Sequence, residues 1–261
     1  MSNLNEILEG VDRIKVSIVM QVNLQDYNGS RRDPINKFHR AVRSFKDQIY
    51  KNCELIIVSD GCNKTHQIYN RSYREDENIK FVYYDRHNVP KMYDEVGEEG
   101  GKYFRGFARN IGIGCATGNV ITYMDSDDFL MPEFAMTCML IYNTDKSKDW
   151  WINTSWYDHI NVDNSNQNIQ AVVDPKTIEA VPIEGLPDLW KPMRLQENRI
   201  IMSPWLFMHS NKVTVAWRDV ISSTVSEDVD FHNRVRAEFP NGIAYSNPIY
   251  VRCHFAEHWD I

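Results

Sequence analysis

The sequence predicts an α/β fold in which a doubly wound, mostly parallel sheet carries helices on both faces. Over the first half of the chain, short runs of β-branched and aliphatic residues alternate with stretches of helical spacing. A polar or glycine-containing turn follows most of these runs, as is usual where a buried strand ends. A group of aspartates stands directly after the last run, and ligands of such sheets bind beyond the carboxyl ends of the strands. We therefore expect a functional site there.

The first strand is predicted at Val16 to Val22, a β-branched run, and the loop at 23–33 that follows it is polar. Pro34 suits the first position of a helix, with Asp33 as the capping residue before it. The apolar residues of this helix recur at steps of three and four, and they are Ile35, Phe38, Val42, Phe45 and Ile49. Because this spacing places them on one stripe, we expect the stripe to face the core.

The next elements continue the alternation. A short buried strand is predicted at Glu54 to Ser59, where the turn Asp60-Gly61 ends it, and another strand at Ile79 to Tyr84. Small and apolar residues at helical spacing predict a helix at Tyr103 to Ala116. The strand predicted at Val120 to Met124 then leads directly into the aspartates.

The second half of the chain has a different pattern. Asn and Asp dominate 158–170, and the segment 174–192 carries four prolines, so both are interpreted as loops around a site. No internal repeat or sharp change of composition marks a linker. The whole chain, 1–261, is therefore expected to form a single domain.

Composition excludes several classes of protein. With 261 residues, 43% of them hydrophobic, the chain can bury a substantial core, and its net charge of -7 gives no overall attraction for nucleic acid or an anionic membrane. The five cysteines include no C-x-x-C pair, which argues against a disulfide framework or a zinc site. No run approaches the ~20 apolar residues of a membrane-spanning helix, and Met1 to Gly10 lacks the features of a signal peptide. We expect a cytoplasmic protein without a transmembrane segment.

The aspartate group, Asp125-Ser126-Asp127-Asp128, places three carboxylates within four residues. Their mutual repulsion is costly without a cation, and oxygen ligands suit Mg²⁺ or Mn²⁺, which keep coordination positions open for substrate phosphates. The pattern therefore favours a metal-assisted reaction of a diphosphate. The alternative is that Asp128 caps or precedes a helix near Pro132 while the other two carboxylates are solvated.

A longer pattern surrounds these aspartates. Residues 106–118 read GFARNIGIGCATG, and VITYMDSDD follows at 120–128. Together they resemble the core signature of family-two GT-A glycosyltransferases, A-R-N-x-G-I-x-x-A-x-G, a strand and D-x-D-D. The matching residues are Ala108, Arg109, Asn110, Gly112, Ile113, Ala116 and Gly118. The run IIVSDG at 56–61 similarly resembles the second strand of the family with its D-D-G turn, although Ser59 replaces the first acid.

The resemblance covers about 14–135 and implies the GT-A fold, a nucleotide-sugar donor and Mn²⁺ or Mg²⁺. By this resemblance Asp60 contacts the donor base, Asp127 binds the metal, and Asp125 binds the metal or the nucleoside. Arg109 orders the acidic loop or the diphosphate, and Asn110 belongs to the same donor-binding group. Gln21 and Asn23 take the place of the usual P-T-Y-N segment and are assigned to donor binding as well. A UDP-sugar is the expected donor, and 136–261 is expected to bind the acceptor and carry the catalytic base.

The candidate base is Asp228. Ser226-Glu227-Asp228 opens a segment in which Val229, Phe231, Val235 and Phe239 form an apolar stripe, so the carboxylates should lie at a helix N-terminus. The segment resembles the E-D motif of the family, in which Asp228 removes the proton of the acceptor hydroxyl and Glu227 accompanies it. A serine N-cap followed by an acidic first turn explains the same residues without catalysis.

A histidine near the C-terminus, His254, stands about where GT-A enzymes often bring a histidine back to the metal. We predict it as a metal ligand beside Asp125 and Asp127, with His258 as a weaker candidate. A satisfied core or surface histidine is the competing interpretation.

The acceptor is the least determined part of the prediction. All seven tryptophans lie in the second half, where flat rings suit sugars, although core packing explains most of them. Basic residues crowd the first loop and the polar face of the first helix, and they are Arg31, Arg32, Lys37, His39, Arg40, Arg43 and Lys46. A solvated helix face is the favoured explanation for this group. The acceptor can be a glycan, a lipid-linked molecule or a hydroxymethylated DNA base. Two other functions also stay open, a nucleotidyltransferase and a catalytically silent sugar-binding module.

Overall fold

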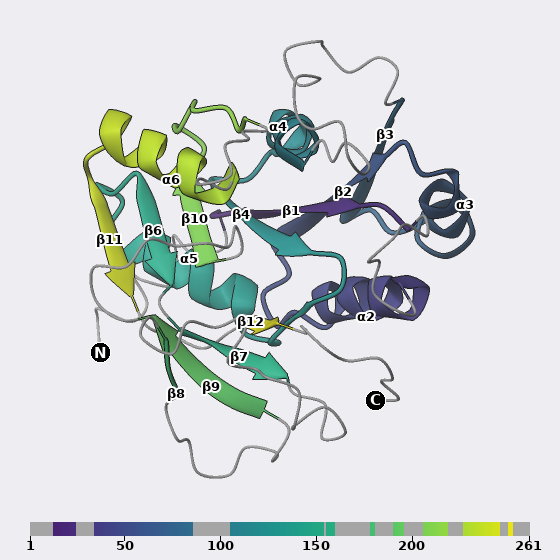
Figure 1. The fold of residues 1–261 in the computed structure, drawn as a ribbon, viewed down its shortest axis with the longest axis horizontal. Coiled ribbons are helices and arrows are strands. Elements are labelled where there is room, and N and C mark those ends of the chain that lie inside the picture. The colour runs from purple at the N-terminus through teal and green to yellow at the C-terminus, as the bar shows by residue number, and fades with distance from the viewer. Residues whose placement is uncertain are drawn as a thin grey trace.

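A computed structural model of the chain describes 13–24, 34–85, 105–153, 155–159, 178–180, 190–195, 206–218, 227–245 and 250–252. Figure 1 shows three layers, a twisted central sheet between two layers of helices, with a second sheet beside one of them.

The central sheet joins strands from both halves of the sequence in the order β11-β6-β10-β4-β1-β2-β3. Its members are β1 (Val16–Val22), β2 (Cys53–Asp60), β3 (Ile79–Tyr84), β4 (Val120–Asp125), β6 (Trp150–Asn153), β10 (Phe207–Ser210) and β11 (Gly242–Tyr245). The four strands from β3 to β4 are mutually parallel, and β10 alone runs antiparallel to its neighbours. The predicted mostly parallel sheet is thus confirmed, with the first three strands and β4 within one residue of their expected bounds.

Helices cover both faces of this sheet, as predicted. They are α2 (Pro34–Lys46), α3 (Asn63–Ser72), α4 (Arg105–Cys115), α5 (Phe134–Thr144) and α6 (Glu227–Glu238). In Figure 1, α4 and α6 lie together on one face, while α2 and α5 lie on the other. Among the described residues, no helix has the length and apolar character needed to cross a membrane.

A second sheet, which the sequence analysis missed, lies below the central one in Figure 1. Its order is β5-β12-β7-β9-β8, with β5 (Phe129–Leu130), β7 (Ser155–His159), β8 (Ile178–Ala180), β9 (Trp190–Leu195) and β12 (Tyr250–Arg252). The interpretation of 174–192 as a loop was therefore wrong for β8 and for the start of β9. Pro192 lies inside β9, opposite Tyr157 of β7. A proline is a poor strand former, so local sequence hid a strand that pairing stabilises.

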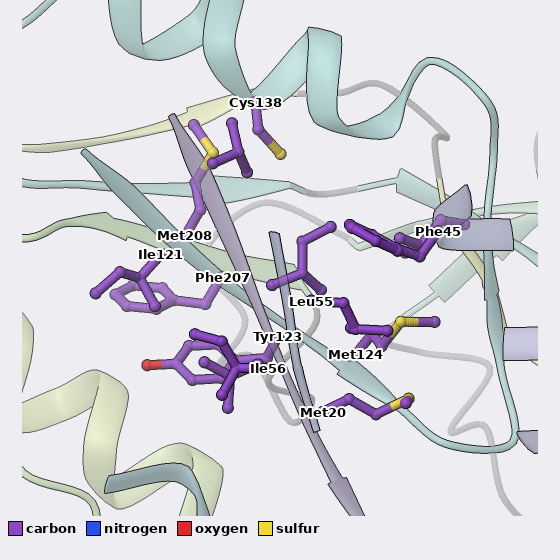
Figure 2. Close-up of a cluster of buried hydrophobic side chains, with 14 of the residues drawn as sticks. Met20, Phe45, Leu55, Ile56, Ile121, Tyr123, Met124, Cys138, Phe207 and Met208 are labelled. Atoms are coloured by element: carbon purple, nitrogen blue, oxygen red, sulfur yellow. The ribbon is translucent and has the colours of Figure 1, made fainter. Parts of the chain in front are cut away.

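The main core fills the space between the central sheet and its helices, and Figure 2 shows part of it around Leu55, Ile56 and Tyr123. All eight residues of β2 are buried, which explains its continuous apolar run. The predicted stripe of the first helix is confirmed at Phe38, Val42 and Phe45. Ile49 was assigned to the same stripe, but it is 60% exposed because α2 ends at Lys46.

Glycine lets α4 approach the sheet closely. A Cβ atom on Gly112 would lie 2.3 Å from Cγ1 of Val19 in β1, so only glycine fits there without displacing one of the two elements. This contact fixes the distance between α4 and β1, and with it the height of Arg109 above the sheet.

Candidate active site

The residues predicted for donor and metal binding gather at the carboxyl edge of the parallel strands. Asp125 is the last residue of β4 and lies opposite Gln21 of β1 in the sheet register. The Oε1 atom of Gln21 is buried, and no described residue donates a hydrogen bond to it. Asn23 follows just beyond the end of β1. An acceptor without a partner beside a carboxylate is an arrangement that a ligand N–H can complete.

Asp60 lies at the same edge, at the end of β2, and is 7% exposed. The hydroxyl of Tyr84 donates a hydrogen bond of 2.7 Å to its Oδ1, and the ring of Tyr84 packs edge-on against Phe107. The turn behind it uses the positive φ of Gly61, 60°, a backbone conformation that glycine adopts without strain. Tyr84 was not predicted from the sequence, because its contact with Asp60 depends on the pairing of β2 with β3.

The acidic loop after β4 is held by a residue of α2. Arg40 donates from Nη2 to the carbonyl oxygen of Asp127, 2.6 Å away, and its guanidinium lies over the ring of Phe129. The interpretation of the basic residues as a purely solvated face was therefore wrong for Arg40, and Lys37 is also buried. Lys37 and Arg40 belong to the polar face of α2, which the spacing of its apolar residues predicts to be exposed to solvent.

Asp128 does not cap the following helix. Its backbone N–H donates to the carbonyl of Asp125, 3.3 Å away, and its side chain is buried. The strand β5 follows it, and α5 begins only after Glu133, which makes no side-chain capping bond. Asp128 is therefore not the N-cap of α5, although it does precede that helix in the chain.

Glu227 and Asp228 open α6, where the sequence placed them, and face α4. Arg109 Nη1 lies 3.2 Å from Oδ1 of Asp228 and 3.7 Å from Oε1 of Glu227. Arg105 Nη1 lies 3.4 Å from the same Glu227 oxygen. Arg109 is 4% exposed, while Arg105 is open to solvent. The buried stripe of α6 includes Phe231 and Val235, as predicted.

Burial raises the pKa of Asp228 to about 7, and the negative charges of Glu227 and Asp125 act in the same direction. The positive charges of Arg109 and Arg105 oppose this rise. A carboxylate with a pKa near neutrality can accept a proton and release it again at physiological pH. Asp125, at the end of β4, is therefore close enough to Asp228 for its charge to affect the pKa of that carboxyl.

Asn110 has a position that the sequence did not predict. Its Nδ2 donates to the carbonyl of Trp217, 2.9 Å away, and its Oδ1 accepts from the N–H of Trp217 at 2.7 Å. Both ends of the amide are engaged with the backbone of a residue 107 positions away. Its assignment to donor binding stays a prediction, because these contacts are structural.

Of the three predicted metal ligands, Asp125 and Asp127 are among the described residues. No three His, Cys, Asp or Glu side chains of the described residues are grouped to hold an ion. His254 and His258 lie outside the described residues. The strand β12 pairs with β5, with Val251 opposite Phe129, the residue after Asp128. The chain therefore passes next to the acidic loop three residues before His254. His254 as a metal ligand stays a prediction.

The fold is that of the GT-A glycosyltransferases, and it agrees with the resemblance of the first half of the sequence. TarS from S. aureus, in its 1-349 fragment, superposes with a TM-score of 0.57 at 14% identity, over 92% of this chain and 60% of that one. It has also been solved with UDP and with UDP-GlcNAc. The mannosyltransferase PcManGT from Pyrobaculum calidifontis, in complex with GDP-Man and Mn²⁺, gives a TM-score of 0.53 at 10% identity, over 96% of this chain and 65% of that one.

One sequence relative carries a name of the same class. An uncharacterised glycosyltransferase from Haemophilus influenzae is 31% identical over 93 residues, which are 35% of this chain and 31% of that protein. The matched segment thus spans about a third of each protein. No model of a known protein family matches the chain.

Proposed function

We propose that this chain is an inverting, metal-dependent glycosyltransferase, a single catalytic domain that moves a sugar from a nucleotide-diphosphate donor to an acceptor hydroxyl. The observation that carries the proposal is that carboxylates from two distant parts of the chain lie within electrostatic range of each other. Asp125 is the last residue of β4, Asp127 lies in the loop after it, and Asp228 lies in the first turn of α6 with a carboxyl pKa of about 7. Asp125 and Asp127 suit a divalent ion that binds the donor diphosphate, and Asp228 suits removal of the acceptor proton.

In the proposed reaction Asp228 accepts the proton of the acceptor hydroxyl. The acceptor oxygen forms a bond to the anomeric carbon from the face opposite the diphosphate, while the bond from that carbon to the phosphate oxygen breaks. The nucleoside diphosphate leaves with the electron pair of the broken bond, and the configuration of the sugar inverts. Arg109 holds the carboxylate in place from 3.2 Å and stabilises its ionised form.

The residues proposed to hold the divalent ion are Asp125, Asp127 and His254. The two carboxylates fit Mg²⁺ or Mn²⁺, because both ions prefer oxygen ligands, and a diphosphate can complete the coordination. When bound, the ion supplies charge neutralisation for the departing nucleoside diphosphate. The Mn²⁺ in the PcManGT complex supports this choice of ion.

The donor base is proposed to lie over the ends of β1 and β2, against Gln21, Asn23 and Asp60. The buried Oε1 of Gln21 suits an N–H of the base, a group that both uracil and guanine carry. The UDP complexes of TarS favour a UDP-sugar, and the GDP-Man complex of PcManGT makes GDP-mannose the necessary comparison.

The test is the slow hydrolysis of donors without acceptor. The protein is incubated with Mn²⁺ and UDP-GlcNAc, UDP-glucose or GDP-mannose, and the release of nucleoside diphosphate is measured with and without EDTA. The proposed metal-dependent glycosyltransferase should release it only when the metal is present. Release of pyrophosphate from a nucleoside triphosphate and a sugar 1-phosphate would instead indicate a nucleotidyltransferase, and no turnover of either kind would leave a binding module. Glycan, lipid-linked and hydroxymethylated DNA acceptors are then screened with the active donor.

A further inference from the structure

Trp217 contacts three elements that carry the candidate site. It lies beyond β10 and is fully buried. The sequence analysis assigned it no role of its own. Its backbone is bound by Asn110 of α4 through the two hydrogen bonds described above. Its indole N–H donates to the hydroxyl of Tyr123, 3.1 Å away, two residues before Asp125 in β4. Its ring stacks on Phe231 of α6 with centroids 3.9 Å apart and planes 9° from parallel.

The same indole faces Arg109. The guanidinium carbon of Arg109 lies 4.5 Å from the centroid of a Trp217 ring, which is within the range of a cation–π contact. Arg109 reaches Asp228 and Glu227 through a single nitrogen, Nη1. A bidentate pair fixes the plane of a guanidinium by itself, and a pair through one nitrogen does not. The indole face of Trp217 therefore fixes the plane of the Arg109 guanidinium, which the ion pair alone leaves free to rotate.

We propose that Trp217 is a positioning residue for the catalytic base, and that Asn110 acts by holding Trp217. This inference rests on the proposed function for its catalytic meaning. Phe231 stands three residues after Asp228 in α6, so the stack on Trp217 sets the position of the helix turn that carries the base. The indole thus orients both partners of the pair, Arg109 from its face and Asp228 through Phe231.

The charges around Asp228 give the inference a measurable consequence. Arg109 and Arg105 approach it from α4, Glu227 lies beside it on α6, and Asp125 at the end of β4 adds a negative charge within electrostatic range. Of these groups, Arg109 is the one that contacts the indole. When the indole is removed, the guanidinium loses a fixed orientation, its attraction for the carboxylate weakens, and the pKa of Asp228 rises further.

The experiment compares Trp217→Leu with Trp217→Phe and Asn110→Ala. Trp217→Phe keeps an aromatic face for Arg109 and should retain kcat within about threefold. Trp217→Leu and Asn110→Ala should lower kcat about tenfold or more and shift the acid limb of the pH profile upward by about half a unit or more, and Trp217→Leu should change the donor KM less than about twofold. Trp151→Leu is the matched control, because Trp151 is about as deeply buried, in β6, and its ring packs edge-on against Tyr142 of α5. It should lower stability without moving the pH profile.

A readout that needs no turnover separates this inference from the proposed function. The carboxyl carbon of Asp228, assigned with Asp228→Asn, is titrated by ¹³C NMR in each folded variant. A higher pKa in Trp217→Leu but not in Trp151→Leu supports the positioning role even if no donor is ever hydrolysed. Equal pKa values of Asp228 in the wild type, Trp217→Leu, Trp217→Phe and Trp151→Leu would overturn the positioning role, even if the wild type is an active transferase.

Discussion

The guanidinium of Arg109 lies 3.2 Å from the carboxylate of Asp228, although 119 residues separate the two in the sequence. The contact joins the A-R-N segment of α4 to the first turn of α6. It brings the two most informative motifs of the sequence into contact.

Asp228→Asn should lower transfer at least about 100-fold, because an amide of the same shape cannot accept the acceptor proton. Donor affinity should stay within about twofold, since the proposed donor contacts lie on β1, β2 and the acidic loop. Transfer rates and calorimetric donor binding are the measurements. Asp230→Asn is the control, because Asp230 lies on the same turn of the helix and pairs with Arg234 instead. Wild-type turnover of Asp228→Asn would exclude it as the base.

Asp127→Asn should abolish the thermal shift that Mn²⁺ and UDP-GlcNAc produce together. The substitution removes one of two carboxylates proposed to bind the ion, while the carbonyl of residue 127 can still accept from Arg40. Asp145→Asn, at the far end of α5, should leave the shift unchanged. If the ligand-induced shift survives in Asp127→Asn, the metal is held elsewhere.

The pH dependence of kcat/KM should show an acid limb near pH 7. Asp228 must be ionised to act, and its pKa of about 7 means that activity falls about tenfold per unit below that pH. Glu227→Gln removes a negative charge that raises this pKa, so the limb should move to lower pH. Arg105→Gln removes a positive charge that lowers it, so the limb should move to higher pH. Shifts of the same sign in both variants would contradict the electrostatic account.

A second pH effect should appear in stability. His209 donates from Nδ1 to the carbonyl of Ser210, and its Nε2 accepts from the hydroxyl of Tyr123. Burial lowers the pKa of His209 to about 4, whereas the unfolded value is 6.5. The unfolded chain therefore binds the extra proton first as the pH falls. The resulting stabilisation is complete above about pH 6.5 and is lost between 6.5 and 4, on the order of 3 kcal/mol in all.

His209→Gln isolates this contribution from that of other titrating groups. The free energy of unfolding of the wild type is measured against that of His209→Gln by urea denaturation at several pH values. The difference should shrink as the pH falls from 7.5 to 4.5. A difference that stays constant across this range would show that His209 is not held neutral by the fold.

Two glycines of α4 should respond in opposite ways to alanine. Gly112→Ala forces a methyl group against Val19 and should cost about 1 to 3 kcal/mol of stability, with a further loss of activity because Arg109 moves with the helix. A Cβ on Gly114 would meet no atom within 4 Å, so Gly114→Ala should stabilise the helix by about 0.5 to 1 kcal/mol. Thermal unfolding measures both, and equal effects would contradict the close packing of α4 on β1.

The sequence determined the parallel part of the sheet, the acidic loop at its carboxyl edge and the helix that begins at Glu227. These features follow from local patterns: β-branched runs, apolar residues at helical spacing and carboxylates directly after a strand. The second sheet could not be predicted in the same way. The prolines and polar residues of its segments disfavour strands locally, and only pairing with distant partners overcomes that preference.

Only the tertiary structure decided the contacts that shape the candidate site. Arg109 reaches Asp228, Asn110 holds Trp217, and Arg40 supports Asp127 across 119, 107 and 87 residues. The sequence placed a carboxylate at the start of α6, but its pKa depends on burial and on charges that α4 and β4 bring beside it. Spacing along the chain determines which face of an element a side chain occupies, whereas packing between elements determines what that side chain meets.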